Sequence, residues 1–152
     1  MTLESSQMEL FHNEKNIKGF FKEYRWLSNF HMCPVYYEGL LYPSSENAYQ
    51  AAKCINQEDK LKFCDYAPSK AKNAGRLVEM RSDWDNIKLR VMYDVSYCKY
   101  VQNQDLAQAL ENTGDAYLEE TNYWGDVYWG VCKGIGENYL GKTLMQIRKD
   151  IA

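Results

Sequence analysis

Four polar or aromatic residues in the segment SSENAYQAAK have types and a spacing that suit chemistry on a sugar: Glu46, Tyr49, Gln50 and Lys53. They recur at i, i+3, i+4 and i+7, which is the spacing of one helical face. Glu46 falls in the first turn, where the helix dipole favours an ionised carboxylate. Such a carboxylate can stabilise a cationic sugar transition state or orient a water, although a first-turn acid is also common on ordinary surfaces. The tyrosine favours a site, because a solvated face rarely needs one.

A second constellation is the basic segment SKAKNAGR. Lys72 and Arg76 are four residues apart and share a helical face, with Lys70 nearby. Gly75 lies between the two cations and would let a backbone or a ligand come close. Two cations beside a small residue suit a phosphate, and the alternative is a solvated basic helix face.

The third constellation is YWGDVYWGVCK, residues 123–133. Asp126 precedes Trp129 by three residues, and two Trp and two Tyr fall within seven positions. These rings could clamp a planar base, with Asp126 as a second acid. The alternative is a loop that packs on its own rings.

Several other chemistries are disfavoured. The chain has only two histidines, His12 and His31, so neither a catalytic triad nor a histidine-rich metal site is expected. No phosphate-binding P-loop occurs. GIGENYLG (Gly134–Gly141) lacks dinucleotide-binding spacing. That segment is either a loop that needs flexible backbone or a source of backbone N–H groups for a phosphate.

The elements that must position these residues are mainly helical. Ser44 or Ser45 caps a helix that runs to about Asn56, with Ala48, Ala51, Ala52 and Ile55 on its packing side. Further helices are predicted over residues 57–66, 68–80, 83–102 and 105–112. Asn138 is expected to cap the last helix, whose buried stripe is Leu140, Leu144, Ile147 and Ile151.

Strand signals are short. A hairpin is predicted over residues 35–42 with Glu38-Gly39 at its turn, and extended segments over 17–24 and 116–121. Residues 122–137 are predicted to form a structured loop. The expected fold is mainly α with a small β-sheet (α+β), in a single domain over residues 17–152 that follows a polar leader, residues 1–16.

Composition bounds the function. A chain of 152 residues suggests one domain, and its net charge of −3 argues against tight binding to long nucleic acids. Five cysteines, with no close pair, make a disulfide framework or a zinc site unexpected and favour a reducing compartment. The N-terminus has no signal-peptide pattern, and no apolar run reaches 18 residues. We therefore expect a cytoplasmic protein with no membrane partner and no metal.

Six sequence blocks in order resemble the NADAR family, also called YbiA-like. They span about residues 20–149: LSNF (Leu27–Phe30), YPSSENAYQAAK (Tyr42–Lys53), SKAKNAGR (Ser69–Arg76) with Trp84, NTGD followed by LEE (Asn112–Glu120), DVYWG (Asp126–Gly130), and the terminus from Asn138 to Arg148. Asn47 stands where the family often has His, so a hydrogen-bond donor stays but a proton shuttle is lost. Tyr128 stands where Phe is usual.

The resemblance implies a YbiA-like multihelical fold and N-glycosidase activity without a cofactor. Characterised members cleave phosphoribosylamino-pyrimidine intermediates of riboflavin synthesis or remove ADP-ribose from guanine bases. The expected substrate is small and nucleotide-like, ADP-ribosyl or phosphoribosyl, and ADP-ribosylated nucleic acid is the other partner considered. A non-catalytic ADP-ribose or NAD reader and a structural or interaction protein are the alternatives.

Under this reading the expected catalytic acids are Glu46 and Asp126. Further residues are expected to bind the phosphates, the base and ribose, or the sugar hydroxyls of the substrate. They are Asn29, Tyr49, Lys53, Lys72, Gly75, Arg76, Trp84, Trp129, Gly130 and Asn138. Lysine and arginine suit the phosphates, the rings suit stacking, and the asparagines suit the sugar hydroxyls.

Overall fold

The computed structural model describes residues 16–152. Their contacts divide them into two compact units: a hairpin unit, residues 28–104, and a terminal unit, which combines residues 16–27 with residues 105–152. The predicted domain bounds stay a prediction, and residues 1–15 of the predicted leader lie outside the described part. Each unit has its own buried core.

The hairpin unit contains one β-hairpin and four helices. The hairpin pairs β2 (Val35–Tyr37) with antiparallel β3 (Leu40–Tyr42), and the helices are α2 (Ser45–Ala51), α3 (Gln57–Lys62), α4 (Pro68–Gly75) and α5 (Trp84–Gln102). The predicted turn is confirmed, because Glu38 and Gly39 both have positive φ, 48° and 85°. Such a turn matches the twist of a two-residue hairpin.

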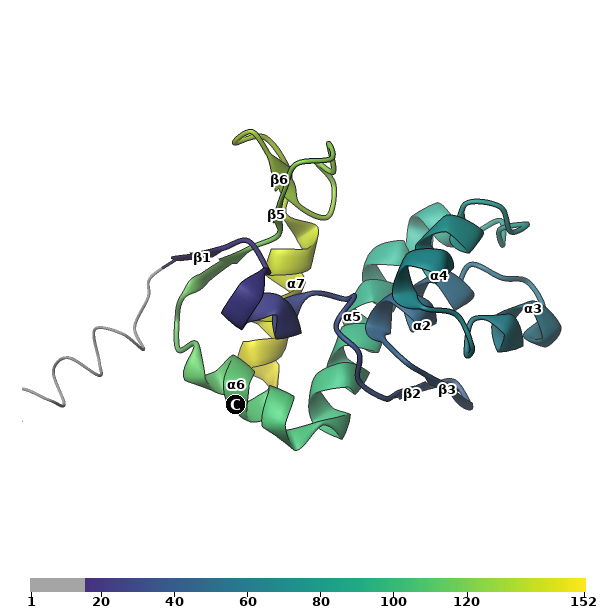
Figure 1. Cartoon of the computed structure of the whole chain (residues 1–152), viewed down its shortest axis with the longest axis horizontal. Helices are drawn as coiled ribbons and strands as arrows, with labels where there is room; N and C mark the ends of the chain where they lie inside the picture. The colour runs from purple at the N-terminus through teal and green to yellow at the C-terminus, as the bar shows by residue number, and fades with distance from the viewer. Residues whose placement is uncertain (1–15) are drawn as a thin grey trace, which may run out of the picture. The chain divides into compact units, whose positions relative to one another are not determined.

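Helix α2 is the centre of this unit, since it contacts α3, α4, α5 and both hairpin strands (Figure 1). Ser44 caps it as predicted, with its Oγ accepting a hydrogen bond from the Asn47 N–H at 3.1 Å. All seven residues of α2 are buried. The face that carries Glu46, Tyr49 and Gln50 is therefore not an ordinary solvated surface, although each of these side chains keeps 5–7% of its area exposed. That this face lines a site stays a prediction.

Helix α2 ends at Ala51, five residues before the predicted Asn56. Tertiary pairing diverts the chain there: Cys54 bridges to Met80, and the Lys53 carbonyl accepts the Arg81 N–H at 2.9 Å. Ile55 is consequently exposed rather than packed, and Lys53 lies just beyond the helix. The same pairing explains why α4 stops at Gly75 instead of Met80.

Other helix bounds follow their capping residues. Asn56 caps α3 through the Asp59 N–H at 3.0 Å, but that helix ends at Lys62, before the predicted Tyr66. Pro68 opens α4 as predicted, since its missing N–H costs nothing at a helix start. Helix α5 has the predicted length.

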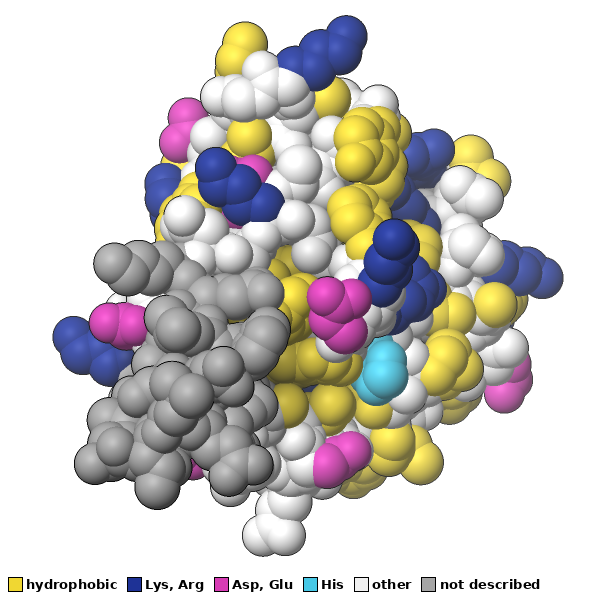
Figure 2. All heavy atoms as spheres, turned by 60° about the vertical axis from the view of Figure 1, so that its left-hand side comes forward, with side chains coloured by type: hydrophobic (Ala, Val, Ile, Leu, Met, Phe, Trp, Pro, Cys, Tyr) yellow, Lys and Arg dark blue, Asp and Glu magenta, His cyan; other side chains and the backbone are white. Residues whose placement is uncertain are grey.

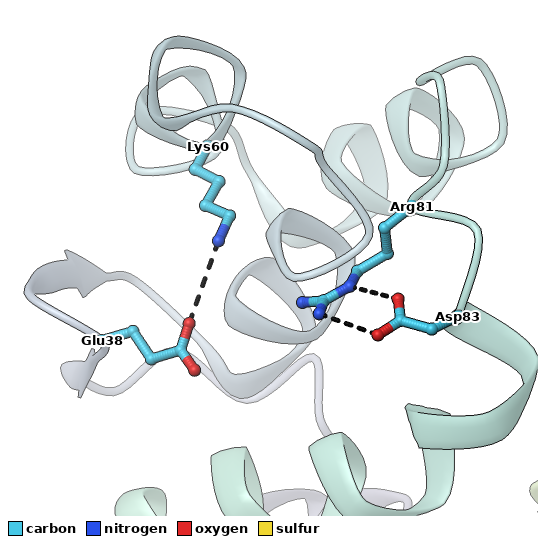
Figure 3. Close-up of polar contacts among 4 residues, drawn as sticks. All are labelled: Glu38, Lys60, Arg81 and Asp83. Carbon is cyan, nitrogen blue, oxygen red and sulfur yellow. Dashed lines mark hydrogen bonds and ion pairs between the residues drawn. The ribbon is translucent and has the colours of Figure 1, made fainter.

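Two ion pairs lie in this unit (Figure 3). Arg81 pairs with Asp83 at 2.6 Å just before α5, and Lys60 of α3 lies 3.9 Å from Glu38 of the hairpin.

The terminal unit combines short strands with two α-helices and a 3-10 helix. Its elements are β1 (Asn16–Lys18), the 3-10 helix η1 (Lys22–Leu27), α6 (Gln104–Asn112), β4 (Tyr117–Glu119), β5 (Thr121–Asn122), β6 (Val131–Cys132) and α7 (Tyr139–Asp150). Strands β1 and β4 pair in parallel, as do β5 and β6. The predicted extended segment 17–24 thus becomes a short strand and a 3-10 helix, while a strand within 116–121 is confirmed.

Helix α7 packs on β4 and buries Leu140, Leu144 and Ile147 as predicted. Asn138 is the N-cap residue of α7 as predicted, with φ of 55°, but its side chain makes no capping hydrogen bond. The carbonyls of Tyr128 and Trp129 accept the first N–H groups of α7 instead, at 3.2 and 2.9 Å. Those N–H groups are thereby satisfied within the protein.

Candidate active site

Glu46 lies in the first turn of α2 and is only 7% exposed. Its backbone N–H donates to the Asn29 carbonyl at 3.1 Å. Its carboxylate Oε1 accepts a hydrogen bond from Gln50 Nε2 at 2.9 Å, one helical turn later. The sequence prediction of Glu46 and Gln50 on one face is therefore confirmed, and the two side chains are in direct contact. A buried carboxylate held in this way has a fixed direction in space.

Tyr49, three residues after that acid, packs against a second ring from another helix. Tyr49 of α2 and Trp84, the first residue of α5, have ring centroids 5.2 Å apart with planes tilted by 60°. Both are about 5% exposed. Lys53 places its ammonium 5.8 Å from the Tyr49 ring and 5.9 Å from the Trp84 ring, within the range of cation–π attraction. Two rings and a cation thus form one cluster.

Positive charge gathers around Lys53. Burial lowers the pKa of Lys53 below its usual range, and the nearby charges of Arg76 and Lys88 lower it further, while Glu46 raises it. Cations gathered around Lys53 in this way would attract an added anion. Lys88 is a member that the sequence did not single out, and its position one turn after Trp84 on α5 is the signal that could have found it.

The predicted phosphate residues of α4 are placed differently from one another. Arg76 follows the end of α4 and is exposed, and it makes no ion pair with residues 16–152. Lys72 is half-buried, with its ammonium 5.7 Å from the Phe30 ring. Gly75 does not leave space open for a ligand as expected, because the Gln50 side chain occupies it.

Two asparagines, one before α2 and one within it, make hydrogen bonds inside the protein. Asn29, predicted to bind sugar hydroxyls, accepts from Ser45 Oγ at 2.9 Å and lies 3.3 Å from Met92 Sδ. Asn47 donates from Nδ2 to the carbonyls of Phe63 and Tyr66, both at 2.8 Å. Asn47 therefore ties α2 to the segment after α3, which is a structural use of the donor that the sequence predicted.

In the terminal unit, Asp126 organises its own loop. Its Oδ1 accepts the N–H groups of Tyr128 and Trp129 at 3.1 and 2.9 Å. The Asn122 side chain donates from Nδ2 to the Asp126 carbonyl and accepts the Asp126 N–H at Oδ1. The Tyr128 ring meets the Trp129 ring edge-on at 4.8 Å and lies as far from the Tyr139 ring. The loop residues 126–130 are thus a packed structure with Asp126 half-buried in it.

Gly130 and Asn138 also have structural contacts in this unit. A Cβ on Gly130 would lie 2.1 Å from the Glu120 carbonyl oxygen, so only glycine fits there. Asn138 is 2% exposed. Its Oδ1 accepts the Glu120 N–H at 3.0 Å, and its Nδ2 donates to the Leu118 carbonyl at 2.9 Å. These contacts compete with the predicted role of Asn138 in binding sugar hydroxyls.

The hairpin unit brings together the predicted residues Glu46, Tyr49, Lys53 and Trp84, while Asp126, Trp129, Gly130 and Asn138 belong to the terminal unit. Within residues 16–152 no cluster of three or more His, Cys, Asp or Glu could hold a metal ion. Lys and Arg side chains occur in small groups among acidic and apolar ones on the face drawn in Figure 2. That face offers no broad basic surface for a long nucleic acid.

No helix in the described part of the chain has the length and apolar character needed to cross a bilayer. The five cysteines are all free thiols in the structure.

Comparison with known proteins agrees with the motif series. A family profile described as the NADAR domain matches residues 10–152. A riboflavin biosynthesis protein of Vibrio vulnificus is 35% identical over 130 residues, which cover 83% of this chain but only 35% of that protein. An N-glycosidase of Nostoc punctiforme is 32% identical over 135 residues, which cover 84% of this chain and 86% of that enzyme.

The N-glycosidase YbiA of Escherichia coli is 31% identical over 134 residues, with 86% of this chain and 83% of YbiA covered. The NMR structure of E. coli YbiA superposes with a TM-score of 0.79 at 30% identity, covering 90% of this chain and 83% of that one. The likeness confirms the predicted YbiA-like α+β fold, in which helices dominate and the sheets are small.

Proposed function

The chain belongs to the NADAR family, and from that premise we propose that it is an N-glycosidase that hydrolyses the bond between ribose C1 and a base nitrogen. The Nostoc and Escherichia relatives carry the name N-glycosidase, and the match extends over more than four-fifths of each of them. The substrate proposed is an ADP-ribosyl or phosphoribosyl compound. The cluster of acid, rings and cations in the hairpin unit is the support for that choice.

The observation that carries the proposal is the buried Glu46 carboxylate, held by Gln50 at 2.9 Å. Breaking the bond from C1 to nitrogen leaves positive charge on C1 and the ring oxygen, as in an oxocarbenium ion. A carboxylate whose direction is already fixed stabilises that charge without reorganising. The bonding electrons leave with the base, and a water oxygen bonds to C1; one hydrogen of that water stays in the new C1 hydroxyl, and the proton that it releases balances the one taken up by the base nitrogen.

The remaining roles follow from charge and shape. Tyr49 and Trp84 would wall in the ribose or the base, because their rings present apolar faces beside the acid-bearing helix. Lys53, Lys72 and Arg76 would hold the phosphates. Asp126 as a second acid and Trp129 as a further stacking ring stay predictions for the terminal unit.

Two substrates follow from the family and differ in size. A free phosphoribosylamino-pyrimidine needs only a small site. The name of the Vibrio relative, a riboflavin biosynthesis protein, supports this substrate. An ADP-ribosylated guanine inside nucleic acid requires an unpaired or extruded nucleotide. The net charge of −3 favours the free metabolite or a single modified nucleotide. Parallel incubations with both substrates, followed by chromatography of the released base, separate them.

Replacing the acid tests the mechanism. Glu46→Gln keeps the size of the side chain and removes its charge, so kcat should fall at least about 100-fold, the scale of one catalytic electrostatic contact. Glu58→Gln is the matched control, because Glu58 is likewise the second residue of a capped helix but is exposed. Full activity of Glu46→Gln would remove Glu46 from the reaction.

The rival function is a non-catalytic reader of ADP-ribose or NAD. The buried rings and the cation group would serve binding equally well. Calorimetry with ADP-ribose distinguishes the two, since a reader binds tightly and turns over neither N-riboside. Release of free base from either substrate excludes a reader.

A further inference from the structure

The Gln50 side chain is buried and makes a single hydrogen bond. It is 6% exposed, and its Nε2 donates to Glu46 Oε1. Its other end, Oε1, has no hydrogen-bond partner among residues 16–152. A buried acceptor without a partner is costly, so the other contacts of this side chain have to offset that cost.

The unpaired oxygen points at Gly75 on the neighbouring helix α4. A Cβ built on Gly75 would lie 1.9 Å from Oε1 of Gln50, 2.7 Å from Cδ of Gln50 and 3.3 Å from Cβ of Gln50. The hydrogen that glycine carries in that place faces the oxygen and can donate only a weak C–H contact. Every larger residue at position 75 would force the carboxamide to move.

The orientation of the carboxamide is fixed by charge. Turning it over would set Oε1 against the Glu46 carboxylate, where two acceptors repel, and would leave Nε2 facing the Gly75 Cα without an acceptor. Helices α2 and α4 pack directly against each other, so the side chain has little freedom to leave.

We propose that Gln50 is a positioning residue, which aims the Glu46 carboxylate, and that Gly75 is required because its missing side chain makes room for the carboxamide. The proposal rests on the role of Glu46 given above. It assigns Gly75 to the support of the acid rather than to contact with substrate. Its consequence is that kcat depends on a residue of α4 that acts only through Gln50.

The experiment is a double-mutant cycle with four variants: Gln50→Met, Gln50→Ala, Gly75→Ala, and Gly75→Ala combined with Gln50→Ala. Gln50→Met keeps the length of the side chain and loses the donor, so kcat should fall about tenfold or more with KM within about threefold. Gly75→Ala should lower kcat similarly and also lower Tm. Asn73→Ala, an exposed change on the same helix, is the control and should alter neither.

The double variant decides whether Gly75 acts through Gln50. Once Gln50 is shortened, the methyl group of Ala at position 75 fills part of the space left behind, so the double variant should have a higher Tm than Gln50→Ala. Its kcat should equal that of Gln50→Ala, since the hydrogen bond from Gln50 to Glu46 is already lost. A further loss of kcat from Gly75→Ala in the shortened background would overturn the proposal.

The outcome separates this proposal from the proposed function. Unchanged kcat in Gln50→Met, together with a large loss in Glu46→Gln, contradicts the positioning role and leaves the glycosidase mechanism standing. Full activity in Glu46→Gln contradicts both. If Gly75→Ala alone does not fold while the double variant does, the steric part is supported, and kcat of Gln50→Met then decides the positioning part.

Discussion

The rings of Tyr49 and Trp84 lie 5.2 Å apart, and the Lys53 ammonium is nearly equidistant from both, at 5.8 and 5.9 Å. This contact joins α2 to the start of α5, beside the turn where Lys53 leaves the helix. The ammonium lies over both rings, whose faces attract a cation. The cluster therefore offers both an apolar wall and a positive charge to one ligand.

Trp84 should matter for folding and for binding to different degrees. Trp84→Ala removes a large buried side chain, and we expect a loss of about 3–5 kcal/mol in the free energy of unfolding. Trp84→Phe keeps a ring and should cost less while raising KM, if the ring walls in the substrate. Urea denaturation and steady-state kinetics measure the two effects. Trp124→Phe, at an exposed site, should change unfolding by less than about 0.5 kcal/mol.

The lowered pKa of Lys53 predicts a pH dependence of substrate binding. The charged form holds a phosphate, so KM should rise as pH increases through a range below that of an ordinary lysine. Lys53→Arg keeps its charge and should abolish this rise, whereas Lys53→Met should bind weakly at every pH. A KM that is as flat with pH in the native protein as in Lys53→Arg would contradict a phosphate role.

The same shift has a definite sign for stability without ligand. Because the pKa of Lys53 is lower when folded than when unfolded, the unfolded chain binds more protons between the two values. The contribution of Lys53 to the free energy of unfolding should therefore increase as pH rises through that window. Thermal melts of the native protein and of Lys53→Met, compared across alkaline pH, measure this difference.

Local signals predicted helix starts well and helix ends poorly. Ser44, Asn56 and Pro68 each act through the backbone within one turn, so sequence alone locates the start of α2, α3 and α4. The ends of α2 and α4 depend on Cys54 pairing with Met80, a contact between distant residues. Periodicity carries no information about such a pairing, which is why both helices were predicted too long.

The candidate site shows the same limit. Spacing on one helix predicted the contact of Glu46 with Gln50, because i, i+4 neighbours meet without help from the rest of the fold. It could not predict that Gly75 receives Gln50, since that depends on how α4 packs on α2. Nor could it predict that the Tyr128 and Trp129 carbonyls would accept the first N–H groups of α7 in place of the Asn138 side chain.

Asn138 offers a test between a structural role and a role in binding. Its side chain links the Glu120 N–H to the Leu118 carbonyl, and both partners would be left unpaired in Asn138→Ala. We expect a loss of about 2–4 kcal/mol in the free energy of unfolding, from two unsatisfied buried groups. Asn73→Ala, on an exposed helix surface, is the control for thermal melts. An unchanged Tm with a raised KM would instead indicate contact with sugar hydroxyls.

Asp126 has two possible roles, and two substitutions separate them. Asp126→Asn keeps Oδ1 as an acceptor for the Tyr128 and Trp129 N–H groups, at 3.1 and 2.9 Å in the native loop, but removes the negative charge. If Asp126 is the second acid, kcat should fall about 100-fold, the scale of general acid–base catalysis, with little change in Tm. Asp126→Ala should lose the same activity and also about 1–3 kcal/mol of stability. Activity that survives in Asp126→Asn and is reduced only in Asp126→Ala would make Asp126 a residue that shapes the loop, and Glu46 the one carboxylate acting on C1.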